Sequence, residues 1–83
     1  MAADPFAEFV THALTELGRK SLRQIQFETA MVWYGRAVAA MTLAKTADAI
    51  EYAHEAIEHA ALSGDMGLLK NIRDGLGRNG IAV

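Results

Sequence analysis

Apolar residues recur along the chain at intervals of three and four residues, which is the spacing of one face of an α-helix. No segment shows sustained alternation of apolar and polar residues, so the pattern predicts an all-α fold without strands. The pair Asp4-Pro5 is a typical helix start, because aspartate can cap free backbone amides and proline is preset for the first helical position. A first helix is therefore predicted over residues 5–17, with Gly18 as its C-terminal cap.

The second predicted helix is the longest and spans residues 21–44. Its apolar residues lie on two sides rather than in one stripe, so we expect neighbours on both sides. Thr46 or Asp48 is the expected cap of a third helix that extends to about residue 62. Asp65 is the expected cap of a fourth helix over residues 66–76.

Gly35 lies in the middle of the long helix, where glycine costs about 1 kcal/mol relative to alanine. Close contact with another helix is the expected reason for a glycine here, and a local kink is the alternative.

These four helices are expected to form antiparallel hairpins around the long second helix. The domain is predicted to span residues 1–76, and residues 77–83 are predicted to be a flexible tail. The long helix carries more apolar side chains than the short neighbours can cover, so we expect an oligomer, most simply a two-fold dimer. The predicted interface residues are Phe27, Met31, Trp33, Tyr34, Val38 and Met41.

Length and composition narrow the class of protein. A chain of 83 residues fits one domain, and at this size only about 60% of the unfolded surface is buried, which makes sharing a core with a second copy favourable. The absence of cysteine excludes disulfides and zinc–thiolate sites. Without a secretory signal or a membrane-length apolar run, the chain is expected to be soluble and cytoplasmic. Its net charge of −2 favours neither nucleic acid nor an anionic membrane as a partner.

Alanines in the third predicted helix recur seven residues apart and each precedes an isoleucine, in Ala49-Ile50 and Ala56-Ile57. Upstream, an aromatic residue and two small residues stand at matching positions of the preceding helix, namely Trp33, Ala37 and Ala40. Over about residues 30–63 the chain thereby resembles a tetratricopeptide repeat. The resemblance implies a helical hairpin of the kind found in protein-binding adaptors, and a generic alanine-rich hairpin is the alternative.

A metal site is an alternative hypothesis, based on Glu51, His54 and Glu58, which lie along one edge of the third helix. Glutamate and histidine three residues apart form a ligand pair in carboxylate-bridged iron sites, which also need glutamates from facing helices. Glu28 is the candidate on the facing helix, but hairpin geometry places it far from Glu51. We therefore expect no metal or other cofactor, and we expect His54 to form a hydrogen bond with Glu58.

Catalytic residues are not predicted, because no serine, threonine or aspartate stands in a recognisable nucleophile context and His12 and His59 are expected on solvated faces. A second alternative is DNA binding, since Arg19, Lys20 and Arg23 follow the expected break at Gly18 as in a helix-turn-helix. The apolar residues that come next belong in a core, which weakens this alternative.

The leading hypothesis is a non-enzymatic protein–protein interaction module, either an adaptor or a small assembly subunit. It is expected to act through an apolar helical groove flanked by acidic residues and through self-association.

Overall fold

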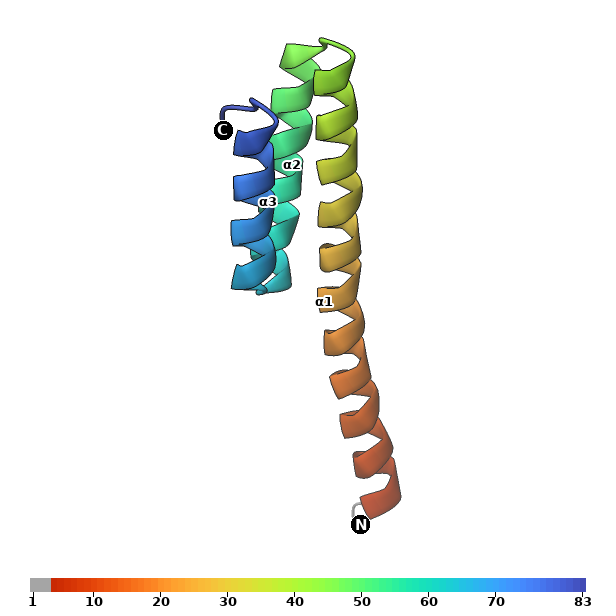
Figure 1. Ribbon diagram of the computed structural model, residues 1–83. Helices are drawn as coiled ribbons and strands as arrows, with labels where there is room; N and C mark the ends of the chain where they lie inside the picture. Colours follow the sequence, from red (N-terminus) through yellow and green to blue (C-terminus); the bar gives the residue numbers. More distant parts are fainter. Residues whose placement is uncertain (1–3) are drawn as a thin grey trace.

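A computed structural model describes residues 4–83, apart from the side chains of residues 14 and 16–21. The described residues form three helices, α1 (Pro5–Thr42), α2 (Thr46–Ser63) and α3 (Met66–Arg78) (Figure 1). No strand occurs within residues 4–83. The expected all-α fold is therefore confirmed.

Helix α1 unites the two helices that were predicted over residues 5–17 and 21–44. It begins as predicted, because Asp4 Oδ1 accepts a hydrogen bond from the Phe6 amide at 3.0 Å and Pro5 occupies the first turn. The helix then continues through Gly18, so the predicted break there is corrected. A single glycine costs only about 1 kcal/mol inside a helix, and the arginine, lysine and leucine residues that follow favour helix.

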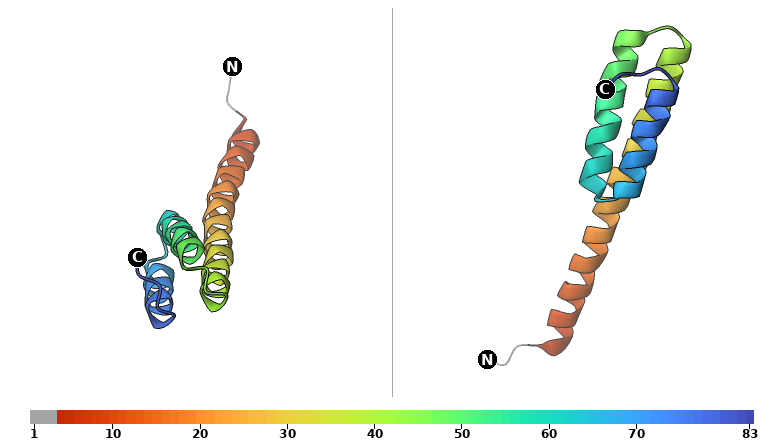
Figure 2. Two further views of the ribbon diagram at one scale, coloured as in Figure 1. Left: turned by 90° about the horizontal axis from the view of Figure 1, so that it is seen from above. Right: turned by 60° about the vertical axis from the view of Figure 1, so that its left-hand side comes forward.

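The chain reverses direction between α1 and α2 through a Schellman turn. Ala44 adopts the left-handed conformation with a φ of 59°. Its amide donates to the Met41 carbonyl at 3.0 Å, and the Lys45 amide donates to the Ala40 carbonyl at 2.8 Å. As a result α2 runs back along the C-terminal half of α1, and α3 then returns beside both helices (Figures 1 and 2).

Alanine dominates the contact between α1 and α2. The buried alanines recur at intervals of three, four or seven residues, the spacing of helices that pack side by side. Because an alanine side chain is a single methyl group, two helices lined with it can approach closely. We call this contact the alanine seam; its residues are Ala30, Ala37 and Ala40 on α1 and Ala49, Ala53, Ala56 and Ala60 on α2.

Larger side chains close the edge of the alanine seam. The rings of Trp33 and Tyr52 lie 5.5 Å apart between centroids, and the Arg36 guanidinium carbon lies 4.8 Å from the Trp33 ring centroid. Farther from the turn between α1 and α2, His59 Nδ1 and Gln26 Oε1 lie 2.5 Å apart. The expectation that His59 lies on a solvated face is thus wrong, because the buried alanines orient the half-buried His59 toward α1.

Helix α3 and the residues after it pack onto this hairpin. Leu68, Ile72 and Leu76 are buried. After Arg78, Gly80 adopts a φ of 74° and the Ile81 amide donates to the Leu76 carbonyl at 2.9 Å, which turns Ile81 back onto the core. Only 4% of Ile81 is exposed, so the packed structure extends beyond the boundary at residue 76 and the expected flexible tail is corrected.

Gly35 makes no close contact with another helix in the described part of the chain, since a Cβ added there would have no neighbour within 4 Å. We therefore expect Gly35→Ala to raise the free energy of unfolding by about 0.5–1 kcal/mol, because alanine favours helix and restricts the unfolded chain. Chemical denaturation followed by circular dichroism measures this change. Gly64→Ala is the matched control, and it should be destabilising because Gly64 has a φ of 75°. A loss of stability in Gly35→Ala would contradict the prediction.

The molecule is elongated, with principal extents of 65 × 19 × 13 Å. Its length comes from α1, whose N-terminal part projects beyond α2 and α3 (Figures 1 and 2). None of the helices in the described residues combines the length and apolar character that a membrane span requires.

Candidate interaction surfaces

Four of the six predicted interface residues are half-buried by the chain's own helices. Trp33, Tyr34 and Met41 pack against the buried core, and Val38 is half-buried. The shelter that we expected from a second copy is therefore supplied here by α2 and α3. Phe27 and Met31 differ, because they stay 40% and 45% exposed.

An open groove lies between α1 and α3 beside these two exposed side chains. Its volume is about 370 Å³, and its lining consists of Phe27, Met31, Tyr34, Leu68, Asn71, Ile72 and Arg78. We call it the α1–α3 groove. Tyr34, one of these lining residues, reaches α3 at Gly75, where an added Cβ would lie 2.9 Å from Tyr34 Cζ. Glycine at this position therefore leaves room for the aromatic ring against α3.

The projecting N-terminal part of α1 is the second apolar surface. Every residue from 4 to 12 is exposed. Phe6 is 72% exposed and Phe9 is 68% exposed, and Val10 and Ile25 are also exposed. The sequence analysis did not select Phe6 and Phe9, because it predicted a separate first helix over residues 5–17. Because α1 is continuous through Gly18, Phe6 and Phe9 lie on the projecting part of the helix, away from the core.

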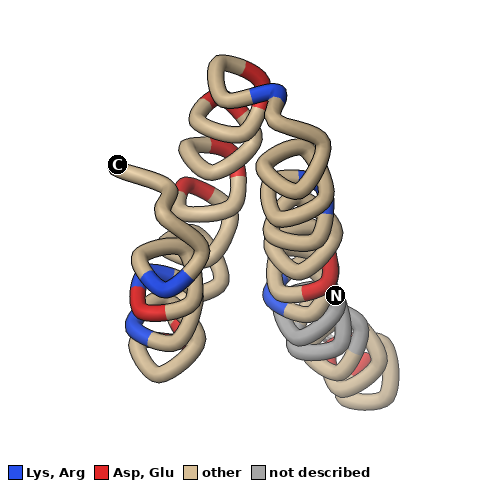
Figure 3. Tube along the Cα trace, turned by 45° about the horizontal axis from the view of Figure 1, so that its top comes forward, with Lys and Arg blue, Asp and Glu red and all other residues tan. Residues whose placement is uncertain are grey.

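Acidic residues recur along α2 (Figure 3) and do not line the α1–α3 groove. They are Asp48, Glu51, Glu55 and Glu58. The charged residue that lines the groove is instead basic, namely Arg78. The acidic Asp48 instead lines a second groove, between α1 and α2, together with Ala39, Ala40 and Leu43.

The candidate metal ligands do not form a cluster. Glu51, His54 and Glu58 are exposed on α2, and among the described residues no three histidine or acidic side chains are arranged to hold a metal ion. Glu28 lies on α1, where it accepts a hydrogen bond from Gln24 Nε2 at 3.2 Å. Within residues 4–83 the hydrogen bonds do not include one between His54 and Glu58, so that expected pair is not formed.

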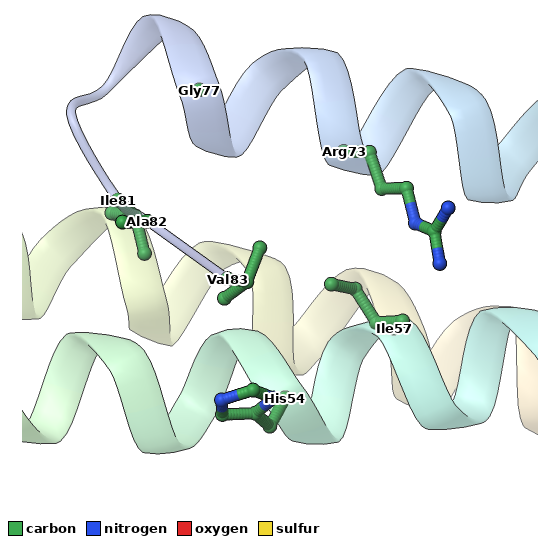
Figure 4. Close-up of a pocket in the computed structure, with 7 residues that line it drawn as sticks. All are labelled: His54, Ile57, Arg73, Gly77, Ile81, Ala82 and Val83. Atoms are coloured by element: carbon green, nitrogen blue, oxygen red, sulfur yellow. The ribbon is translucent and has the colours of Figure 1, made fainter.

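His54 lies at the edge of a hollow of about 560 Å³ between α2 and α3. Figure 4 shows that Arg73 of α3 and the C-terminal Val83 line the same hollow. One imidazole, one guanidinium and aliphatic groups make up its side-chain lining. These groups do not include a carboxylate or hydroxyl side chain that could act with His54 in acid–base chemistry.

The basic residues that suggested DNA binding fall within α1. Arg23 is exposed, whereas the side chains of Arg19 and Lys20 lie outside the described residues. Because α1 is continuous across Gly18, the turn that a helix-turn-helix requires is not formed there. His12, farther along the same helix, is exposed as expected.

Comparison of the chain with protein-family models, curated proteins and solved structures found no significant match.

Proposed function

We propose that this protein is a non-enzymatic protein–protein interaction module that self-associates through the apolar surface of α1. The observation that carries the proposal is the exposure of Phe6 and Phe9, at 72% and 68%, on a part of α1 without neighbours in the described chain. Burying one such side chain contributes about 1.5–3 kcal/mol. Two of them on each copy provide a substantial driving force for association.

Helix stability supports the same proposal. The N-terminal part of α1 extends beyond α2 and α3 (Figure 1), and every residue from 4 to 12 is exposed. Most helices gain their stability from packing an apolar face against a neighbour. A binding partner that covers Phe6 and Phe9 would supply that neighbour.

The packed part of the chain serves, in this proposal, as the scaffold that presents α1. The buried alanines at positions 37, 40, 49 and 56 support a hairpin of the tetratricopeptide type, because they lie between the two helices where that resemblance expects small residues. An adaptor or assembly subunit in the cytoplasm is the role that we assign to such a scaffold.

Sedimentation of the wild-type protein and of Phe9→Glu tests the proposal. We expect wild-type dimers at micromolar concentration and a dissociation constant at least tenfold higher for Phe9→Glu, since a charge on an apolar contact surface removes at least about 1.4 kcal/mol of binding energy. Circular dichroism should show an unchanged packed core.

Leu43→Glu is the matched control, because Leu43 is exposed but lies at the opposite end of α1. It should dimerise like the wild type. A wild-type protein that remains monomeric at several hundred micromolar would refute self-association.

A further inference from the structure

A single row of residues follows one side of α1 at alternating intervals of four and three residues. This spacing keeps side chains on one side when two helices wind around each other. Its members in order are Phe6, Val10, Ala13, Leu17, Lys20, Gln24, Phe27, Met31 and Tyr34. Helix α3 covers the row at Tyr34 but leaves Phe27 and Met31 partly open and does not reach Phe6. An established contact within the chain therefore continues into an uncovered surface.

The row is nearly symmetric about its middle. Large apolar residues stand at both ends, Phe6 and Val10 at one and Phe27 and Met31 at the other. When two copies of α1 pair in opposite directions, Phe6 meets Met31 and Val10 meets Phe27, because each pair is equally distant from the midpoint. A two-fold axis repeats both contacts, as an isologous interface requires.

Parallel pairing would be less favourable for the same row. It would place the acidic N-terminal ends of the two copies, with Asp4 and Glu8, beside each other, and like charges repel. It would also put Phe6 next to Phe6 and leave the α1–α3 groove without an occupant.

We propose that a second copy of this chain inserts Phe6 into the α1–α3 groove through antiparallel pairing of the two α1 helices, which rests on the proposed self-association. Charge supports this occupant. Asp4 and Glu8 flank Phe6, and the sequence contains no lysine or arginine before position 19. The groove that receives this acidic end is lined by Arg78, so opposite charges meet.

The apolar area available approaches what a specific dimer needs. Aromatic side chains bury about 150–250 Å² each, so the exposed parts of Phe6 and Phe27, and of Phe9 beside the row, offer roughly 700 Å² in two copies. Met31 and Val10 bring the apolar total closer to the roughly 1,000 Å² that a stable interface needs, and the polar rim of the pairing adds to it. Both grooves of the dimer would be filled at once.

Disulfide trapping tests the pairing directly, because the chain has no cysteine of its own. Phe6→Cys protein is mixed with Met31→Cys protein and oxidised gently. We expect a covalent heterodimer, since a disulfide needs Cα atoms within about 7 Å and the pairing brings positions 6 and 31 together. The opposite end of the same heterodimer keeps its native Phe6–Met31 contact, which maintains the association.

Two cysteine controls test whether cross-linking of positions 6 and 31 is specific. Phe6→Cys alone should not form a disulfide-linked dimer, because positions 6 of the two copies would lie about 38 Å apart along the helix axis. Phe6→Cys mixed with Val32→Cys should cross-link at least tenfold more slowly than with Met31→Cys, since Val32 is similarly exposed but lies on the adjacent face of α1.

Arg78→Gln should raise the dissociation constant severalfold at low salt, and Lys70→Gln, on the same helix but outside the groove, should not.

Rapid disulfide formation by Phe6→Cys alone would show parallel pairing and would overturn the inference. Equal cross-linking of positions 31 and 32 would overturn it as well, because it would show that no defined register exists. If the wild type sediments as a dimer and position 6 fails to cross-link with position 31, self-association stands and the antiparallel pairing falls. A wild-type protein that stays monomeric would contradict both self-association and the antiparallel pairing.

Discussion

Replacing Leu76 with alanine should lower the free energy of unfolding by about 3 kcal/mol, within the range of about 2–5 kcal/mol for buried leucines. Leu76 is the largest side chain that is fully buried in the described chain. It lies in α3 and belongs to a core in which most of the buried residues are alanine, whose methyl groups have no rotamers to change and so cannot fill a cavity. A domain of this size has only about 4–12 kcal/mol of total stability, so the variant should be close to unfolding at room temperature.

Urea denaturation at a fixed protein concentration, followed by circular dichroism, measures this loss. Leu62→Ala is the matched control, because it is the same substitution at an exposed position of α2. It should change stability by less than about 0.5 kcal/mol, as is usual for surface sites. Equal losses in the two variants would show that Leu76 does not hold α3 against the hairpin.

Local signals in the sequence predicted two of the three N-terminal helix caps. The expected cap of α2 by Thr46 or Asp48 is wrong, because Lys45 is the N-cap and makes no side-chain capping hydrogen bond. Asp4 and Asp65 were expected to cap helices, and both do, with Asp65 Oδ1 accepting a hydrogen bond from the Leu68 amide at 2.9 Å. The capping interaction depends only on residues within one turn, so it can be recognised without knowledge of the fold. The same holds for Gly64, which ends α2 in the left-handed conformation.

Gly18 shows where such local reasoning fails. A glycine ends a helix where a turn allows the following segment to pack against the rest of the chain. Gly64 is such a case, because the turn there lets α3 pack on α2. At Gly18 the chain does not turn, and α1 continues as one helix. The glycine's conformational cost of about 1 kcal/mol is small beside the hydrogen bonds that a continuous helix retains. The length of α1, and with it the exposed position of Phe6 and Phe9, therefore could not be read from the glycine alone.

The candidate interface was only partly predictable for a related reason. Apolar composition showed that the long helix needs cover on two sides, but it could not show that α3 supplies part of that cover. Tyr34 reaches α3 only because Gly75 leaves room for its ring, and this contact joins residues 41 positions apart. The alternation of four and three residues in the alanine seam was present in the sequence and would have shown which side of α2 faces α1.

Replacing one alanine of the alanine seam with a larger residue should lower the free energy of unfolding nearly as much as Leu76→Ala does. Ala56 is fully buried between α1 and α2, in the same contact as Ala37 and Ala53. Leucine there adds three carbon atoms where the helices already touch, so the helices must separate or the side chain must adopt a strained rotamer. We expect Ala56→Leu to lower the free energy of unfolding by about 2–3 kcal/mol, the upper part of the range for overpacked cores.

Ala61→Leu is the control for Ala56→Leu, since it makes the same change on the exposed side of α2 and leucine favours helix almost as well as alanine. Its stability should stay within about 0.5 kcal/mol of the wild type. The Trp33 fluorescence spectrum adds a second measurement, because Trp33 stacks near Tyr52 at the edge of the alanine seam and should become more exposed to water in Ala56→Leu alone. Unchanged stability and fluorescence in Ala56→Leu would mean that α1 and α2 do not pack closely through alanine, and α1 would then lack the rigid support from which its N-terminal part is proposed to reach a second copy.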